Sequence, residues 1–129
     1  MKIVILLPRF NEEYGLKLLD STIKTLNKNK IKNIQTIRVP GALEIPFAAL
    51  KAIKKSKPNV VIALGIILKG ETDHYEYVSS ETFRGLMDVQ LKTETPIVFG
   101  VLTCRTEKQV KDRLDNGKWF AETAIEIAK

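Results

Sequence analysis

Residues 60–64 read Val-Val-Ile-Ala-Leu, five apolar residues without a polar one between them, and this run decides the fold. A short, unbroken run rich in valine and isoleucine is typical of a strand that is covered on both faces, as strands of a parallel sheet are. Three further runs, at residues 3–7, 34–39 and 97–102, are also short and rich in valine and isoleucine, although Gln35, Thr36 and Arg38 interrupt the second. The sequence therefore predicts four buried parallel strands.

Helical patterns lie between these runs and after the last one. Their apolar residues recur at three- and four-residue spacing, which is the spacing of one helix face. These residues are Leu16, Leu19, Ile23 and Leu26; Phe47, Leu50 and Ile53; Tyr77, Phe83, Leu86, Met87 and Leu91; and Val110, Phe120, Ala124 and Ile127, with an expected break at Asn116-Gly117. Alternating strands and helices predict right-handed βαβ units. We therefore predict a single domain over residues 1–129, a three-layer α/β/α fold around a four-stranded parallel, flavodoxin-like sheet.

Composition excludes several classes of protein. No apolar stretch reaches the roughly 18 residues needed to span a bilayer. The single cysteine, Cys104, fits a reducing compartment, so we expect a cytoplasmic protein. One histidine and one cysteine exclude a zinc site built from those ligands. The net charge of +6 suggests nucleic acid, but the densest lysine cluster (Lys51, Lys54, Lys55 and Lys57) has no interleaved aromatic residues, and we expect a solvated helix face and no nucleic-acid or membrane partner.

Ligands of parallel α/β folds bind at the carboxyl ends of the strands, so the loops after the four runs are the candidate site. In the third loop the strand is expected to end at Gly65, and Thr72 or Asp73 to cap the following helix. Free amides at a helix start bind anions, and Gly70 lets the backbone approach a ligand closely. His74, the only histidine, falls in the first helical turn, where the helix dipole favours a neutral imidazole that accepts a proton. The alternative is a surface histidine.

The first two loops carry a ring and a carboxylate. Phe10 either fills the rim of the core or offers a flat face to a heteroaromatic ring, with Asn11 as a polar neighbour. In the second loop, Pro40 and Pro46 enclose a glycine and Glu44, which is suited to binding hydroxyl groups. A stiff turn before a helix explains the prolines equally well, but it does not explain Glu44.

Together these loops resemble the lumazine synthase family. The resemblance rests on four motifs in the family's order and spacing: Arg9-Phe10-Asn11, then VPGALEIP at residues 39–46, KGETDHYEYV at residues 69–78 and PIVFGVLT at residues 96–103. It covers nearly the whole chain. It implies an enzyme of riboflavin biosynthesis that makes 6,7-dimethyl-8-ribityllumazine from 5-amino-6-(D-ribitylamino)uracil and 3,4-dihydroxy-2-butanone 4-phosphate, without a cofactor or a metal ion.

The resemblance also implies roles for individual residues. Phe10, with Asn11 beside it, stacks on the pyrimidine ring. The ribityl chain is bound by Ala42, Leu43 and Glu44. The edge of the ring is bound by Ile66, Ile67 and Leu68. The turn at Glu71 and Thr72 holds the phosphate, and His74 transfers protons. Phe99 and Arg113 come from the neighbouring subunit of a homopentamer, where Arg113 pairs with the phosphate.

Two departures from the family and several alternatives stay open. Lys69 stands where the family has arginine, and the loop after Arg113 is short, which leaves Lys118 as a possible further partner of the phosphate. The sequence does not distinguish a free pentamer from a larger shell. The rival interpretations are a flavodoxin-like flavin binder or phospho-receiver, a lumazine carrier without turnover, and the related archaeal-type riboflavin synthase.

Overall fold

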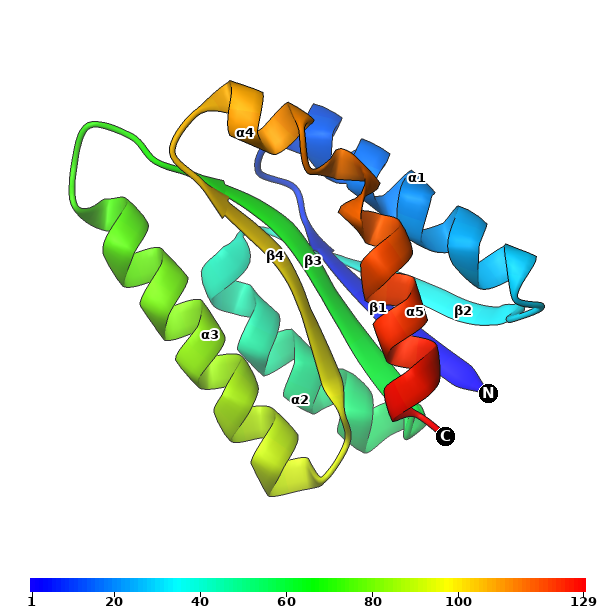
Figure 1. Cartoon of the computed structure of the whole chain (residues 1–129). Coiled ribbons are helices and arrows are strands. Elements are labelled where there is room, and N and C mark those ends of the chain that lie inside the picture. The colour runs from blue at the N-terminus through cyan, green and yellow to red at the C-terminus, as the bar shows by residue number, and fades with distance from the viewer.

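Four parallel strands form the centre of the computed structural model, which describes all 129 residues (Figure 1). The strands are β1 (Lys2–Pro8), β2 (Asn33–Val39), β3 (Val60–Leu68) and β4 (Ile97–Cys104). They lie in the order β2-β1-β3-β4, and every pair is parallel. All four predicted strands are present, although β3 and β4 continue beyond their predicted ends. The prediction that all four are buried is wrong for β2, an edge strand in which only Val39 is buried.

The helices form two layers around the sheet. They are α1 (Glu12–Lys28), α2 (Ile45–Ser56), α3 (His74–Thr93), α4 (Glu107–Lys111) and α5 (Gly117–Ile127), with short 3-10 helices η1 (Ala42–Glu44) and η2 (Leu114–Asn116). The helices α1 and α5 pack together on one face, and α2 and α3 on the other (Figure 1). The predicted three-layer, flavodoxin-like fold is therefore confirmed, and the expected helix break lies between α4 and α5. None of the helices has the length and apolar character needed to cross a membrane.

The unbroken apolar runs are explained by a core on each side of the sheet. Along β1, Ile3, Ile5 and Leu7 pack on the α1 and α5 side, while Val4 and Leu6 pack on the α2 and α3 side. Successive strand residues point to opposite faces, so a strand that is covered on both faces needs apolar residues at every position.

The predicted apolar helix faces are partly wrong. Phe47, Tyr77 and Leu91 are about 70% exposed, at 70%, 69% and 69% respectively. Smaller residues lie on the buried sides instead, among them Ala49 of α2 and Thr82 of α3. Closely packed helices favour small residues at their contact, and large side chains at the predicted spacing are left on the outer surface.

The predicted turn at Gly65 is also wrong, because β3 continues to Leu68. Gly65 pairs with Val101 inside the sheet. A Cβ atom at Gly65 would lie 3.3 Å from the ring carbons of Pro8. The glycine therefore accommodates the close approach of Pro8, at the end of β1, to β3.

The order of the strands places the topological switch point of the sheet, the crevice of doubly wound folds, at the carboxyl ends of β1 and β3. Pairing of β1 with β3 stops at Leu6 and Ala63, whereas β3 pairs with β4 as far as Leu68. The chain leaves β1 toward β2 on one side and leaves β3 toward β4 on the other. Such a switch point is where ligands bind in doubly wound sheets.

Candidate active site at the carboxyl ends of the strands

The loop from β1 to α1 borders this crevice and consists of residues 9–11. The Arg9 amide donates to the Val39 carbonyl at 2.9 Å. Asn11 has a left-handed backbone, with φ of 55°, and its Nδ2 donates to the Ile66 carbonyl at 3.1 Å. Phe10 between them is 72% exposed. This exposure is not that of a core residue and leaves the ring free to contact a ligand.

The second loop lies against the Phe10 ring. A Cβ atom at Gly41 would be 3.5 Å from Cδ2 of Phe10 and 3.0 Å from Oε1 of Glu44. Leu43 and Glu44 are exposed, and Ala42 is half-buried. An aromatic face, a backbone stretch and a carboxylate therefore meet at one place, and β3 borders it on the other side through Ile66.

The end of β3 offers mainly its backbone. The Ile66 and Ile67 side chains are 4% and 7% exposed, and Leu68 is half-buried. Their side chains belong to the core, so only the strand edge faces the crevice. One carbonyl of that edge, that of Ile66, already accepts the hydrogen bond from Asn11.

The loop from β3 to α3, residues 69–73, is tied only at its ends. The Lys69 amide donates to the Cys104 carbonyl at 2.9 Å, and its Nζ pairs with Glu76 at 3.1 Å. This hydrogen bond from Lys69 lowers the pKa of Glu76 below its ordinary value. Between these ends the turn is open, because nothing lies within 4 Å of a Cβ atom built at Gly70.

The predicted start of α3 is confirmed. Asp73 is its N-cap residue, although its side chain makes no capping hydrogen bond. The His74 amide donates to Oγ1 of Thr72 at 3.3 Å. Glu71, Thr72 and His74 are all exposed at this helix start. The turn thus presents a helix N-terminus to solvent, an arrangement suited to an anion.

Two predicted site residues lie outside this cluster. Phe99 is level with Ala63 in the first half of β4, and its ring stacks on Phe83 with a centroid distance of 5.9 Å. It lines a groove of about 610 Å³ that also contains Met87 and Trp119. Arg113 is exposed just before η2 and donates to the Gln109 carbonyl at 3.0 Å. The structure shows no hydrogen bond or ion pair from Arg113 to residues 70–74.

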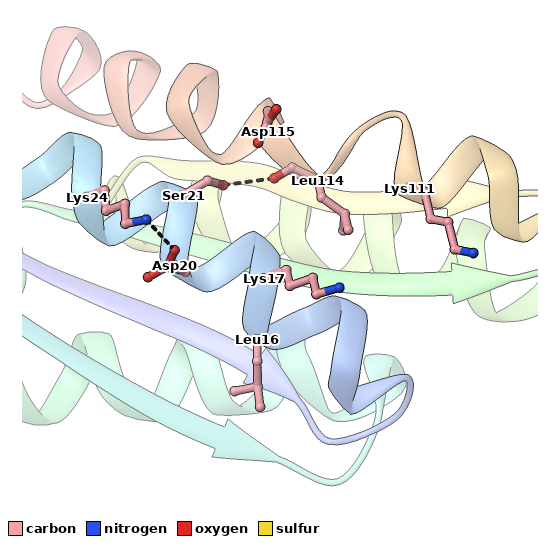
Figure 2. A pocket seen from close by; sticks show the side chains of 8 residues that line it. All are labelled: Leu16, Lys17, Asp20, Ser21, Lys24, Lys111, Leu114 and Asp115. Carbon is pink, nitrogen blue, oxygen red and sulfur yellow. Dashed lines mark hydrogen bonds and ion pairs between the residues drawn. The ribbon is translucent and has the colours of Figure 1, made fainter.

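A second groove, of about 560 Å³, lies between α1 and η2 (Figure 2). It is lined by Leu16, Lys17, Asp20, Ser21, Lys24, Lys111, Leu114 and Asp115. In it Ser21 donates to the Leu114 carbonyl at 2.8 Å, and Lys24 pairs with Asp20 at 3.0 Å. The bond from Ser21 fastens η2, and with it the segment after Arg113, to α1, whereas the Lys24–Asp20 pair lies within α1. The groove contains none of the predicted site residues.

Comparison with known families identifies the family of the chain. The family model described as 6,7-dimethyl-8-ribityllumazine synthase matches residues 1–129. The chain belongs to this family. The resemblance inferred from the loops is confirmed, and so is the predicted class of enzyme, a transferase of riboflavin biosynthesis.

Membership in the lumazine synthase family also bears on the alternatives. A match over the whole chain favours the synthase over a phospho-receiver, a flavin binder and a riboflavin synthase. It implies the two small-molecule substrates and an oligomeric assembly. It does not assign roles to residues. Sequence reasoning also missed a residue beside the crevice, Arg38, whose only signal is its place directly before the Val39-Pro40-Gly41 motif.

Proposed function

We propose that the crevice between β1 and β3 binds 5-amino-6-(D-ribitylamino)uracil and that the turn before α3 binds 3,4-dihydroxy-2-butanone 4-phosphate. The exposed ring of Phe10 is the observation that carries this proposal. It lies beside Gly41, and the Glu44 carboxylate lies on the same glycine, at the switch point of the sheet. A flat apolar face beside a carboxylate fits a flat heterocycle with a hydroxylated chain.

The individual contacts follow from this arrangement. Phe10 stacks on the pyrimidine, with Asn11 holding the loop and bordering the ring. Residues 42–44 bind the ribityl chain, with the Glu44 carboxylate accepting hydrogen bonds from its hydroxyl groups. The backbone of residues 66–68 binds the edge of the ring. The buried side chains of Ile66 and Ile67 support this use of the backbone.

The phosphate binds at the start of α3. Amides of Glu71 and Thr72 face the phosphate, because the N-terminal end of a helix carries unpaired donors and a partial positive charge. Gly70 leaves room for the ligand, which is consistent with the empty space around it. Arg113 of a neighbouring subunit completes the site with a charge-assisted bond, and Lys118 is the candidate for a further cationic contact.

The reaction needs mainly alignment of the two substrates. The primary amine of the pyrimidine attacks the carbonyl of the butanone and forms an imine with loss of water. Phosphate then leaves by elimination, and the ring closes with loss of a second water molecule. Holding two reactants in register can lower the barrier by roughly 7–11 kcal/mol. His74, beside the phosphate turn, transfers protons during these steps and adds about 10²–10⁴-fold.

The assembly in this proposal is a ring of five subunits that share their sites. Surplus apolar surface supports association: Trp119 is 66% and Ile127 57% exposed in the groove that contains Phe99. Phe99 lies in the first half of β4, an edge strand, away from the crevice of its own subunit. It therefore reaches a substrate only in a neighbouring subunit, and a cyclic assembly repeats such an interface around the ring.

The direct test is to mix the purified protein with both substrates and follow the absorbance of the lumazine product. The proposal predicts product only when both substrates are present. A matched reaction without the butanone phosphate gives the background. Absence of product at saturating concentrations of both substrates would contradict the proposed function.

A further inference from the structure

The loop that carries Phe10 is short and exposed, so its conformation needs an explanation. It has three residues, and the ring at its centre is 72% exposed. A ring with so little packing of its own is oriented by the backbone that carries it. The groups that fix the two ends of the loop therefore fix the ring.

One side chain of β2 contacts both ends of this loop. Arg38 is paired with Leu7 in the register of the sheet. Its Nε donates to the Leu7 carbonyl at 3.2 Å, and its Nη2 makes a longer contact of 3.5 Å with the Pro8 carbonyl. The same Nη2 forms an ion pair with Glu12, the first residue of α1. The guanidinium group thus joins the last residues before the loop to the first residue after it.

The ion pair lies at the surface on the Glu12 side, and only its arginine is partly buried. The Arg38 side chain is only 29% exposed, and that of Glu12 is 49% exposed. Exposed pairs contribute little, whereas a partly desolvated guanidinium with several acceptors holds its partners in a defined geometry. A lysine can replace it only in part, because an ammonium group lacks the planar fork that reaches separate acceptors.

We propose that Arg38, together with Glu12, is a positioning residue that clamps the β1–α1 loop and orients Phe10 for the pyrimidine substrate. This inference rests on the proposed stacking role of Phe10. The clamp reduces the number of loop conformations before the substrate arrives, and such preorganisation improves binding without a new contact to the ligand. Arg38 itself does not touch the substrate.

The first test compares Arg38→Ala, Arg38→Lys and Glu12→Gln with the unmodified enzyme. We expect Arg38→Ala to raise KM for the pyrimidine by about three- to tenfold, with KM for the butanone phosphate unchanged. Arg38→Lys recovers part of this loss, and Glu12→Gln has a smaller effect than Arg38→Ala. A purely structural role would instead lower Tm and the fraction of active enzyme, without a selective change in one KM.

The second test is a double-mutant cycle with Phe10→Ala. If Arg38 acts through the ring, Arg38→Ala raises KM for the pyrimidine in the unmodified enzyme but adds little in the Phe10→Ala background. The control is Lys24→Gln, which removes an exposed ion pair with Asp20 on the same helix as Glu12 and leaves both KM values unchanged.

The outcomes separate the clamp from the stacking proposal. If Phe10→Ala does not change KM for the pyrimidine, the proposed stacking fails. If Phe10→Ala raises that KM but Arg38→Ala does not, or the two effects are fully additive, the clamp is overturned. A selective, non-additive effect supports it.

Discussion

Two loops border the crevice, and the chain holds them very differently. In the β1–α1 loop, bonds from Arg9 and Asn11 tie the backbone to β2 and β3, and Arg38 contacts both ends. In the β3–α3 loop, the bonds lie at the ends, and no atom of the chain lies within 4 Å of a Cβ atom at Gly70. One loop is preformed, and the other is open.

The difference corresponds to the chemistry of the two proposed ligands. A pyrimidine ring is recognised by shape, and a fixed aromatic face discriminates by shape before the ligand binds. A phosphate carries its own charge and organises donors around itself. The open turn therefore suits a site that is complete only when the phosphate and a neighbouring subunit are both in place. Cations gathered there beforehand would repel one another as long as the site is empty.

Arg113→Ala should produce the largest selective effect. We expect KM for the butanone phosphate to rise about 10–100-fold, because a charge-assisted hydrogen bond to phosphate is lost. KM for the pyrimidine should stay constant, which would show that the two loops bind different substrates. Steady-state kinetics with each substrate varied in turn measures both values. Equal effects on the two substrates would contradict a phosphate contact.

His74→Ala should slow turnover by about tenfold or more without abolishing it, since proton transfer is only one part of the acceleration. Because His74 is exposed at the start of α3, the fold should be unaffected. The measurement is kcat at saturating concentrations of both substrates, with a thermal melt as the control. An unchanged kcat would show that His74 is an ordinary surface residue.

Phe10→Ala tests the preformed loop. Stacking contributes about 1 kcal/mol, so KM for the pyrimidine should rise several-fold. Tm should change little, because the ring is 72% exposed. An unchanged KM combined with early melting would identify Phe10 as a core residue. The β1–α1 loop would then not be a preformed site for the pyrimidine.

Gly70→Ala tests the open loop, with Gly100→Ala as a matched glycine control. At Gly70 the added methyl group meets nothing in the chain, so Tm should hold while KM for the butanone phosphate rises about two- to fivefold through a poorer approach of the backbone. At Gly100 a Cβ atom would lie 2.7 Å from Cδ2 of Leu64 and 3.0 Å from the Ala63 carbonyl, and overpacking should lower stability by about 1–3 kcal/mol. If Gly70→Ala melts as early as Gly100→Ala, the β3–α3 loop is not open around Gly70.

The strands could be predicted from the sequence because a strand covered on both faces leaves an unbroken apolar run, as at residues 60–64. The buried sides of the helices could not. Small residues such as Ala49 and Thr82 are buried where the helices pack, while the large side chain of Phe47 is exposed on the surface. Periodicity of large residues alone does not distinguish a core from an association surface.

The candidate site was predictable where a motif is local. The start of α3 at His74 follows from the residues around it. The misplaced turn at Gly65 and the missed Arg38 have a common cause. Each depends on a partner in another strand, Pro8 for the first and the Leu7 carbonyl for the second, and only the register of the sheet brings those partners together.

Each site is proposed to be shared by two subunits, and complementation between His74→Ala and Arg113→Ala tests this sharing most directly. The two variants are coexpressed with different tags, and mixed assemblies are purified through both tags and assayed at a butanone phosphate concentration well below the KM of Arg113→Ala. A shared site predicts that random mixing restores about a quarter of the interfaces to a complete site, and activity rises above that of both parents. Mixed assemblies no more active than the parents, or an active monomer in sedimentation, would contradict the account.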